Sequence, residues 1–91
     1  SNNVIEFLQS EGYIRFKADA EASSKVLYEA YKLWCEDNVR KPMSASRLSS
    51  ELAQNERLYN VEATNNIHVN GKRVRGFIGI EVLAKMPFLK W

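Results

Sequence analysis

The sequence has little of several residue types on which particular protein classes depend. One cysteine, Cys35, stands among 91 residues, which excludes a disulfide within the chain and is typical of a reducing compartment. No apolar run approaches the roughly 20 residues of a membrane-spanning helix, and no signal-peptide pattern opens the chain. The four glycines form no Gly-x-x-x-x-Gly-Lys-Ser/Thr pattern. These absences argue against a disulfide scaffold, a membrane anchor and a phosphate-loop enzyme.

Length and composition indicate one folded domain. The chain is 45% hydrophobic and 26% charged, close to the average for globular domains. The net charge is only +2, but it is unevenly distributed. Residues 1–37 carry four basic and seven acidic side chains, whereas residues 38–91 carry nine basic and four acidic ones. This asymmetry predicts a side that faces a polyanion. Because Ser1 stands where an initiator Met would be, we expect a segment of a longer protein.

Hydrophobic periodicity predicts three helices. The first spans about 3–11, with Asn3 and Glu6 as a capping box and Gly12 as the stop. The second spans about 24–37, with Ser23 or Ser24 as N-cap. Its broad apolar arc predicts that it is the central helix. The third spans about 44–54 and begins at Ser44.

Two segments predict strands. Residues 13–17 alternate as a short strand, and residues 18–24 are expected to be a connection. Asn70 and Gly71 predict the turn of a hairpin over about 58–83. On its second strand we expect Val74, Ile78, Ile80 and Val82 to face inward, and Arg73, Arg75 and Phe77 to share the other face. The apolar tail, residues 84–91, is expected to dock on the body.

The order helix, strand, helix, turn, helix, hairpin is that of an α+β winged helix, in which the hairpin is the wing. We therefore predict a single winged-helix domain over residues 1–91.

No catalytic constellation is visible, so we expect no enzymatic activity from this domain. His68 has no Cys or carboxylate at metal-ligand spacing and is expected to be a solvent-facing strand residue. Cys35 is expected to be a buried small hydrophobe, and Glu36 and Asp37 to be a solvated helix end. Tyr28, Tyr31 and Trp34 could stack on bases, but their helical spacing on an apolar arc favours the core.

The feature of the sequence that indicates a function is the basic hairpin, which we expect to lie beside the polar third helix. Cations at a loop tip neutralise phosphates, and small hydroxyl side chains let a helix approach a nucleic-acid backbone closely. The alternative is that the cations only protect an exposed sheet edge from aggregation. Phe77 is a weaker base-contact candidate, and Arg57 is a further nearby cation. The predicted DNA contacts are Lys41, Ser44, Ser46, Arg47, Ser50, Gln54, Lys72, Arg73 and Arg75.

Two segments resemble a known family. The run Leu27-Tyr28-Glu29-Ala30-Tyr31-Lys32-Leu33-Trp34-Cys35 and the run Gly71-Lys72-Arg73-Val74-Arg75-Gly76-Phe77-Ile78-Gly79-Ile80 are similar to motifs of phage and plasmid primase-helicases, the poxvirus-type superfamily 3 replicative helicases. The resemblance covers about residues 4–83.

The resemblance implies a DNA-binding accessory domain of a phage, prophage or plasmid replication protein in the bacterial cytoplasm. It implies DNA and an adjoining helicase domain as partners, with ATP and Mg expected only in that helicase domain. For this domain we expect no cofactor, no small-molecule ligand and no membrane. The alternative is a protein-docking or oligomerisation module, which predicts an exposed apolar patch at Phe88, Leu89 and Trp91 or around Tyr31.

Overall fold

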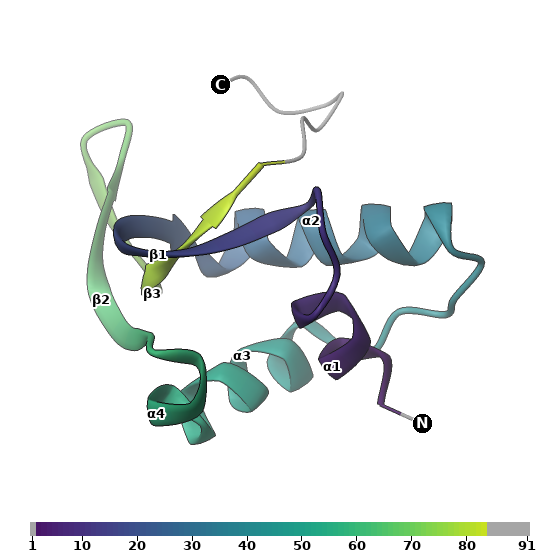
Figure 1. Cartoon of the computed structure of the whole chain (residues 1–91). Helices are drawn as coiled ribbons and strands as arrows, with labels where there is room; N and C mark the ends of the chain where they lie inside the picture. Colours follow the sequence, from purple (N-terminus) through teal and green to yellow (C-terminus); the bar gives the residue numbers. More distant parts are fainter. Residues whose placement is uncertain (1, 84–91) are drawn as a thin grey trace.

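The computed structural model describes residues 2–83, which form four helices and a three-stranded antiparallel sheet of strand order β1-β3-β2 (Figure 1). This confirms the predicted α+β class, and the order of elements is consistent with a winged helix. The predicted docking of residues 84–91 lies outside the described residues. In chain order the elements are α1 (Asn3–Leu8), β1 (Ile14–Ser23), α2 (Ser24–Asp37), α3 (Ala45–Gln54), α4 (Glu56–Tyr59), β2 (Glu62–Val69) and β3 (Lys72–Val82).

Helix α2 is the element around which the others pack, as predicted. The Ser23 hydroxyl caps it by accepting a hydrogen bond from the Val26 N–H at 3.2 Å. Its apolar arc contacts α1, α3, β1 and β3. The Phe7 ring of α1 lies 5.4 Å from the Tyr31 ring and 6.0 Å from the Trp34 ring. Tyr31 and Trp34 are therefore core residues, while Tyr28 packs against the core edge.

Helix α1 is shorter than predicted. Its N-cap is Asn2, whose side chain accepts from the Val4 N–H at 3.0 Å, and it ends at Leu8, well before Gly12. The predicted capping box at Asn3 and Glu6 is wrong because both side chains have tertiary partners instead.

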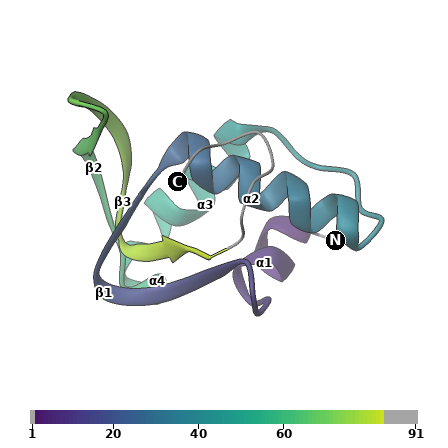
Figure 2. The ribbon, with the colours of Figure 1, turned by 90° about the horizontal axis from the view of Figure 1, so that it is seen from above.

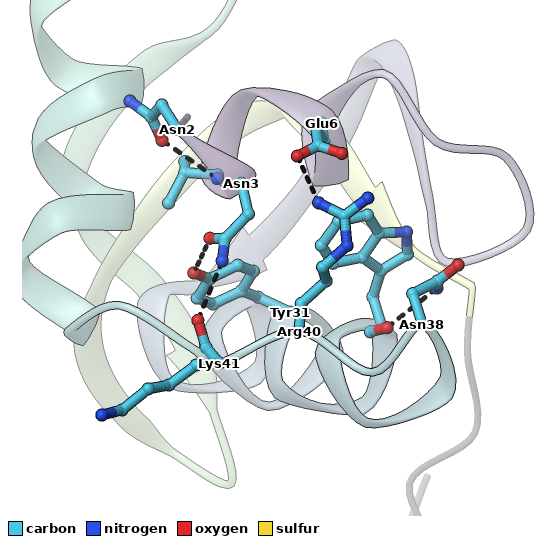
Figure 3. A network of polar contacts seen from close by, with 9 residues as sticks. Asn2, Asn3, Glu6, Tyr31, Asn38, Arg40 and Lys41 are labelled. Atoms are coloured by element: carbon cyan, nitrogen blue, oxygen red, sulfur yellow. Dashed lines mark hydrogen bonds and ion pairs between the residues drawn. The ribbon is translucent and has the colours of Figure 1, made fainter.

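These partners fix the turn between α2 and α3 (Figure 3). Tyr31 donates its hydroxyl hydrogen to the Asn3 side-chain oxygen, and the same hydroxyl accepts from the Met43 N–H at 2.7 Å. The Asn3 amide donates to the Lys41 carbonyl oxygen at 2.8 Å. Glu6 pairs with Arg40 at 2.6 Å. The turn is thus held by α1 as well as by the two helices it joins.

The strand β1 is longer than predicted, and the expected connection over residues 18–24 is wrong. Ile14 to Phe16 pair with β3, and pairing resumes from Glu21 to Ser23. Between these two segments β1 has four residues where β3 has only Gly79, so β1 bulges and then returns to the sheet. A polar, Ala-rich bulge has no alternating pattern from which the sequence could predict it.

The hairpin begins later than predicted, because the short helix α4 precedes β2. Asn60 ends α4 with a φ of 56°. The predicted turn is confirmed: Asn70 and Gly71 have φ values of 51° and 79°, as a type I′ turn requires. The turn end of the hairpin projects from the body, as Figure 2 shows from above.

The predicted exposure of Phe77 is wrong. Phe77 is only 4% exposed and belongs to the core, as does Ile80, three residues along the same strand. Two core residues at this spacing require a break in the alternation, and Gly79 provides it with a φ of 104° at the β1 bulge. At Phe77 this face of β3 therefore points toward the core, which leaves little of the ring free to meet a base.

Candidate nucleic-acid interface

A groove of about 580 Å³ lies between α3 and the hairpin. Its lining combines one face of α3, the start of α2 and the middle of the hairpin. Most of the lining side chains are small or polar. The lining residues are Ser24, Ala45, Ser46, Ser49, Ser50, Ala53, Ala63, Thr64, Asn65, Arg75, Gly76 and Phe77.

Helix α3 contributes an almost continuous small-residue face to this groove. Ser44 starts the helix by accepting the Arg47 N–H at 3.2 Å, and Asn55 ends it by donating to the Glu51 carbonyl oxygen at 2.8 Å. Leu48 and Leu52 are buried on the inner face. The opposite face presents only serines and alanines to the groove. A helix with such a face lets a sugar-phosphate backbone approach closely while offering hydroxyl donors.

The hairpin places Arg75 at the groove through a bulge in β2. Thr64 pairs with Gly76 and Ile67 pairs with Val74, so two residues of β2, Asn65 and Asn66, stand opposite Arg75 alone. The Thr64 hydroxyl accepts from the Asn66 N–H at 3.1 Å and supports this bulge. Bulges of this kind re-aim side chains.

Gly76 fixes how closely the hairpin approaches β1. A Cβ atom at this position would lie 2.2 Å from the Ala22 carbonyl oxygen and 2.8 Å from the Ile67 Cγ1. Only glycine leaves room for this contact. The neighbouring Arg75 is therefore held at the groove by close backbone packing on one side and by the β2 bulge on the other.

The electrostatics of the groove favour an anion. Residues 63–80, which form most of the hairpin, contain no Asp or Glu. No carboxylate stands among the described lining residues, and Arg75 is the charged one. Glu62, which precedes Ala63, and Glu56, which accepts from the Ala63 N–H at 2.7 Å, are not among the lining residues, nor is Glu51, which accepts from the Tyr59 hydroxyl at 2.9 Å. Burial and this carboxylate raise the pKa of Tyr59 to about 12.

All nine predicted DNA contacts are exposed, but the structure brings only three of them into the groove. Ser46 and Ser50 come from α3 and Arg75 from β3. Arg73 lies nearer the hairpin turn and donates to the Asn66 side-chain oxygen at 3.3 Å. Lys41 is on the α2–α3 turn, with its side chain directed away from the Asn3 contact (Figure 3). The predicted contacts outside the groove are Lys41, Ser44, Arg47, Gln54, Lys72 and Arg73.

Sequence reasoning missed several groove residues. Ser49 follows from the helical spacing of Ser46 and Ser50, because positions 45, 46, 49, 50 and 53 share one helix face. Thr64 and Asn65 could not be found, because no local signal predicts the β2 bulge. Ser24 has only the local signal of a helix cap, which does not point to a groove.

The other two residues considered for chemistry, Cys35 and His68, lie where the sequence predicted. Cys35 is buried, and burial raises the pKa of its thiol, so it is a packed side chain as predicted. His68 is exposed on β2, as predicted. Among residues 2–83 no three His, Cys, Asp or Glu side chains are grouped as metal ligands. Within the same residues no helix has the length and apolarity needed to cross a membrane.

The exposed apolar patch expected around Tyr31 for a docking module is not found, since Tyr31 is fully buried. The other expected patch, in the tail, lies outside the described residues.

Comparison with known families agrees with the resemblance at the family level. Residues 1–77 match the family described as Poxvirus D5 protein-like. Since this match covers most of the chain, the protein belongs to that family, the D5-like primase-helicase family. No curated protein and no solved structure matches the chain.

Proposed function

We propose that this domain binds duplex or forked DNA through the groove between α3 and the hairpin, mainly by contacting phosphates. The observation that carries the proposal is the lining of the groove. An arginine, an asparagine and several hydroxyl side chains converge there from α2, α3, β2 and β3, and no carboxylate of the described residues lies among them. Such a set of donors suits a phosphate backbone and carries little base-specific information.

The proposed arrangement places α3 at the major groove and the hairpin along the adjacent backbone. Ser46, Ser49 and Ser50 then donate to phosphates, and Arg75 neutralises one of them. Arg73 and Lys72 extend the basic surface toward the hairpin turn. The polar, small-residue face of α3 supports close approach rather than sequence reading.

In this proposal the domain is a non-catalytic accessory part of a phage, prophage or plasmid primase-helicase in the bacterial cytoplasm. The family membership supports the replication context. The adjoining helicase domain is the proposed protein partner and holds the ATP and Mg of the parent protein. The domain itself needs no cofactor for the proposed role.

Fluorescence anisotropy tests the proposal directly. The domain is titrated into fluorescently labelled duplex and forked DNA at low ionic strength and again at increasing salt. We expect measurable affinity that falls as salt rises, because binding releases counterions from the DNA. Absence of salt-dependent affinity for both DNAs would overturn the proposal.

A further inference from the structure

The hairpin carries a histidine besides its three cations, Lys72, Arg73 and Arg75. His68 is the one histidine in the sequence, and it lies on β2 two residues before the turn. It is exposed, and in the β2–β3 register it stands directly opposite Arg73. Residues directly opposite in an antiparallel pair share a face, with Cβ atoms roughly 4.5–5.5 Å apart.

The face that His68 shares is the one that carries the groove arginine. Arg73, Arg75 and Phe77 alternate along β3, so they project from the same face. Arg75 and Phe77 line the groove. The imidazole thus extends the row of hairpin cations on the face proposed to meet DNA.

The surroundings of His68 contain cations and hardly any free carboxylate. Across the pair β3 presents Lys72, Arg73 and Arg75, and residues 63–80 contain no acidic side chain. Glu62 lies at the far end of β2. Helix α3 and strand β1 also contact β2. The Glu51 carboxylate of α3 accepts from Tyr59 and Asn55, and the other charged residue of α3 is Arg47. On β1, Arg15 pairs with Glu81, Asp19 lies 3.8 Å from Lys17, and Glu21 stands opposite Ile78, five positions along β3 from Arg73.

We infer that His68 is a further phosphate-binding residue of the hairpin and that it contacts DNA in its protonated form, which makes DNA binding depend on pH. This inference rests on the proposed function. No neighbouring carboxylate of the hairpin competes for the imidazolium, so a DNA phosphate is the anion available to it. Histidine changes charge between about pH 5 and 8, and binding of a phosphate favours the charged form.

The test measures anisotropy with the same labelled duplex at about pH 5 and pH 8, each over a range of salt. For the wild-type domain we expect affinity about two- to fivefold higher at the lower pH, the effect of one exposed ion pair. We also expect the slope of log K against log salt to be steeper there by about 0.9, the value for one additional phosphate contact. His68→Gln should remove both differences, and His68→Lys should bind at both pH values as tightly as the wild type does at low pH.

The outcomes separate this inference from the proposed function. Salt-dependent binding with the same affinity and slope at both pH values would overturn the role of His68 and leave the groove proposal intact. The role of His68 is likewise overturned if His68→Gln keeps the full pH dependence, because the α-amino group also titrates in this range. Lack of salt-dependent binding at either pH would overturn the proposed function and this inference with it.

Discussion

Tyr31 and Asn3 are joined by a hydrogen bond from the tyrosine hydroxyl to the asparagine side-chain oxygen, which links the centre of α2 to the start of α1. The same hydroxyl accepts from the Met43 N–H at 2.7 Å. One buried oxygen therefore fixes the first helix and the turn that precedes α3. Because α3 forms one wall of the groove, this contact also sets the geometry of the candidate interface.

Tyr31→Phe should lower the free energy of unfolding by about 1–3 kcal/mol, since it leaves the Met43 N–H without its partner in a buried site. Urea unfolding followed by circular dichroism measures the change. Tyr13→Phe is the matched control, because the Tyr13 hydroxyl donates to Asp37 at 2.5 Å on the surface. Equal unfolding midpoints for wild type and Tyr31→Phe would show that the contact does not stabilise the fold.

Val39→Gly should stabilise the protein. Val39 has a φ of 53° in the turn after α2, and its side chain is 92% exposed, so strain there has little compensating contact. The left-handed conformation costs a side-chain-bearing residue roughly 1–2 kcal/mol, partly offset by the greater freedom of glycine in the unfolded chain. We expect a net gain of about 0.5–1 kcal/mol in thermal unfolding. Val39→Ala keeps a Cβ atom, so its free energy of unfolding should rise less than that of Val39→Gly. If the alanine variant is more stable than the glycine variant, backbone strain at Val39 is not the cause of the gain.

Gly76→Ala should destabilise the domain more than Gly71→Ala does. The new Cβ at position 76 would lie 2.2 Å from the Ala22 carbonyl oxygen, so β1 or β3 must shift. Overpacking of this kind costs about 1–3 kcal/mol or more. Gly71 has open space around it and only its φ of 79° opposes a side chain, which costs about 1–2 kcal/mol. Thermal melts rank the two variants, and the reverse order would contradict the close approach of the hairpin to β1.

Alkaline pH should weaken the fold through Tyr59. Burial and Glu51 raise its pKa from 10.0 to about 12, so the folded state keeps the phenolic proton where the unfolded state has lost it. The resulting stabilisation is complete below pH 10 and is lost as pH rises through about 12. The pKa values of Tyr13 and Tyr31 are raised as well, which acts in the same direction. The urea midpoint of wild type should therefore fall relative to that of Tyr59→Phe across this range, and a constant difference would contradict the shift.

The sequence predicted the elements that have strong local signals. Helix α2 has a broad apolar arc and a serine cap, and α3 has Ser44, and both helices stand within a residue of their expected positions. The turn of the hairpin lies at Asn70 and Gly71 as predicted, although the hairpin itself begins later than expected. The bulges could not be predicted, because they depend on pairing between distant segments. Gly79 in particular reverses the alternation of β3 and moves Phe77 into the core.

In the candidate site too, residues with local sequence signals could be predicted, whereas residues placed by pairing between distant segments could not. Ser46, Ser50 and Arg75 were predicted from residue type and helical or strand spacing, and they do line one groove. Asn65 and Thr64 reach it through the β2 bulge, which has no signal in the sequence.

The salt dependence of duplex binding by Arg75→Ala tests the central claim most directly. The matched control is Lys17→Ala, which removes one exposed cation from β1, where Lys17 lies 3.8 Å from Asp19 and outside the groove lining. We expect Arg75→Ala to bind more weakly than wild type and to flatten the slope of log K against log salt by about 0.9, while Lys17→Ala retains the wild-type slope. If the two variants bind alike, the groove between α3 and the hairpin is not the DNA-binding surface.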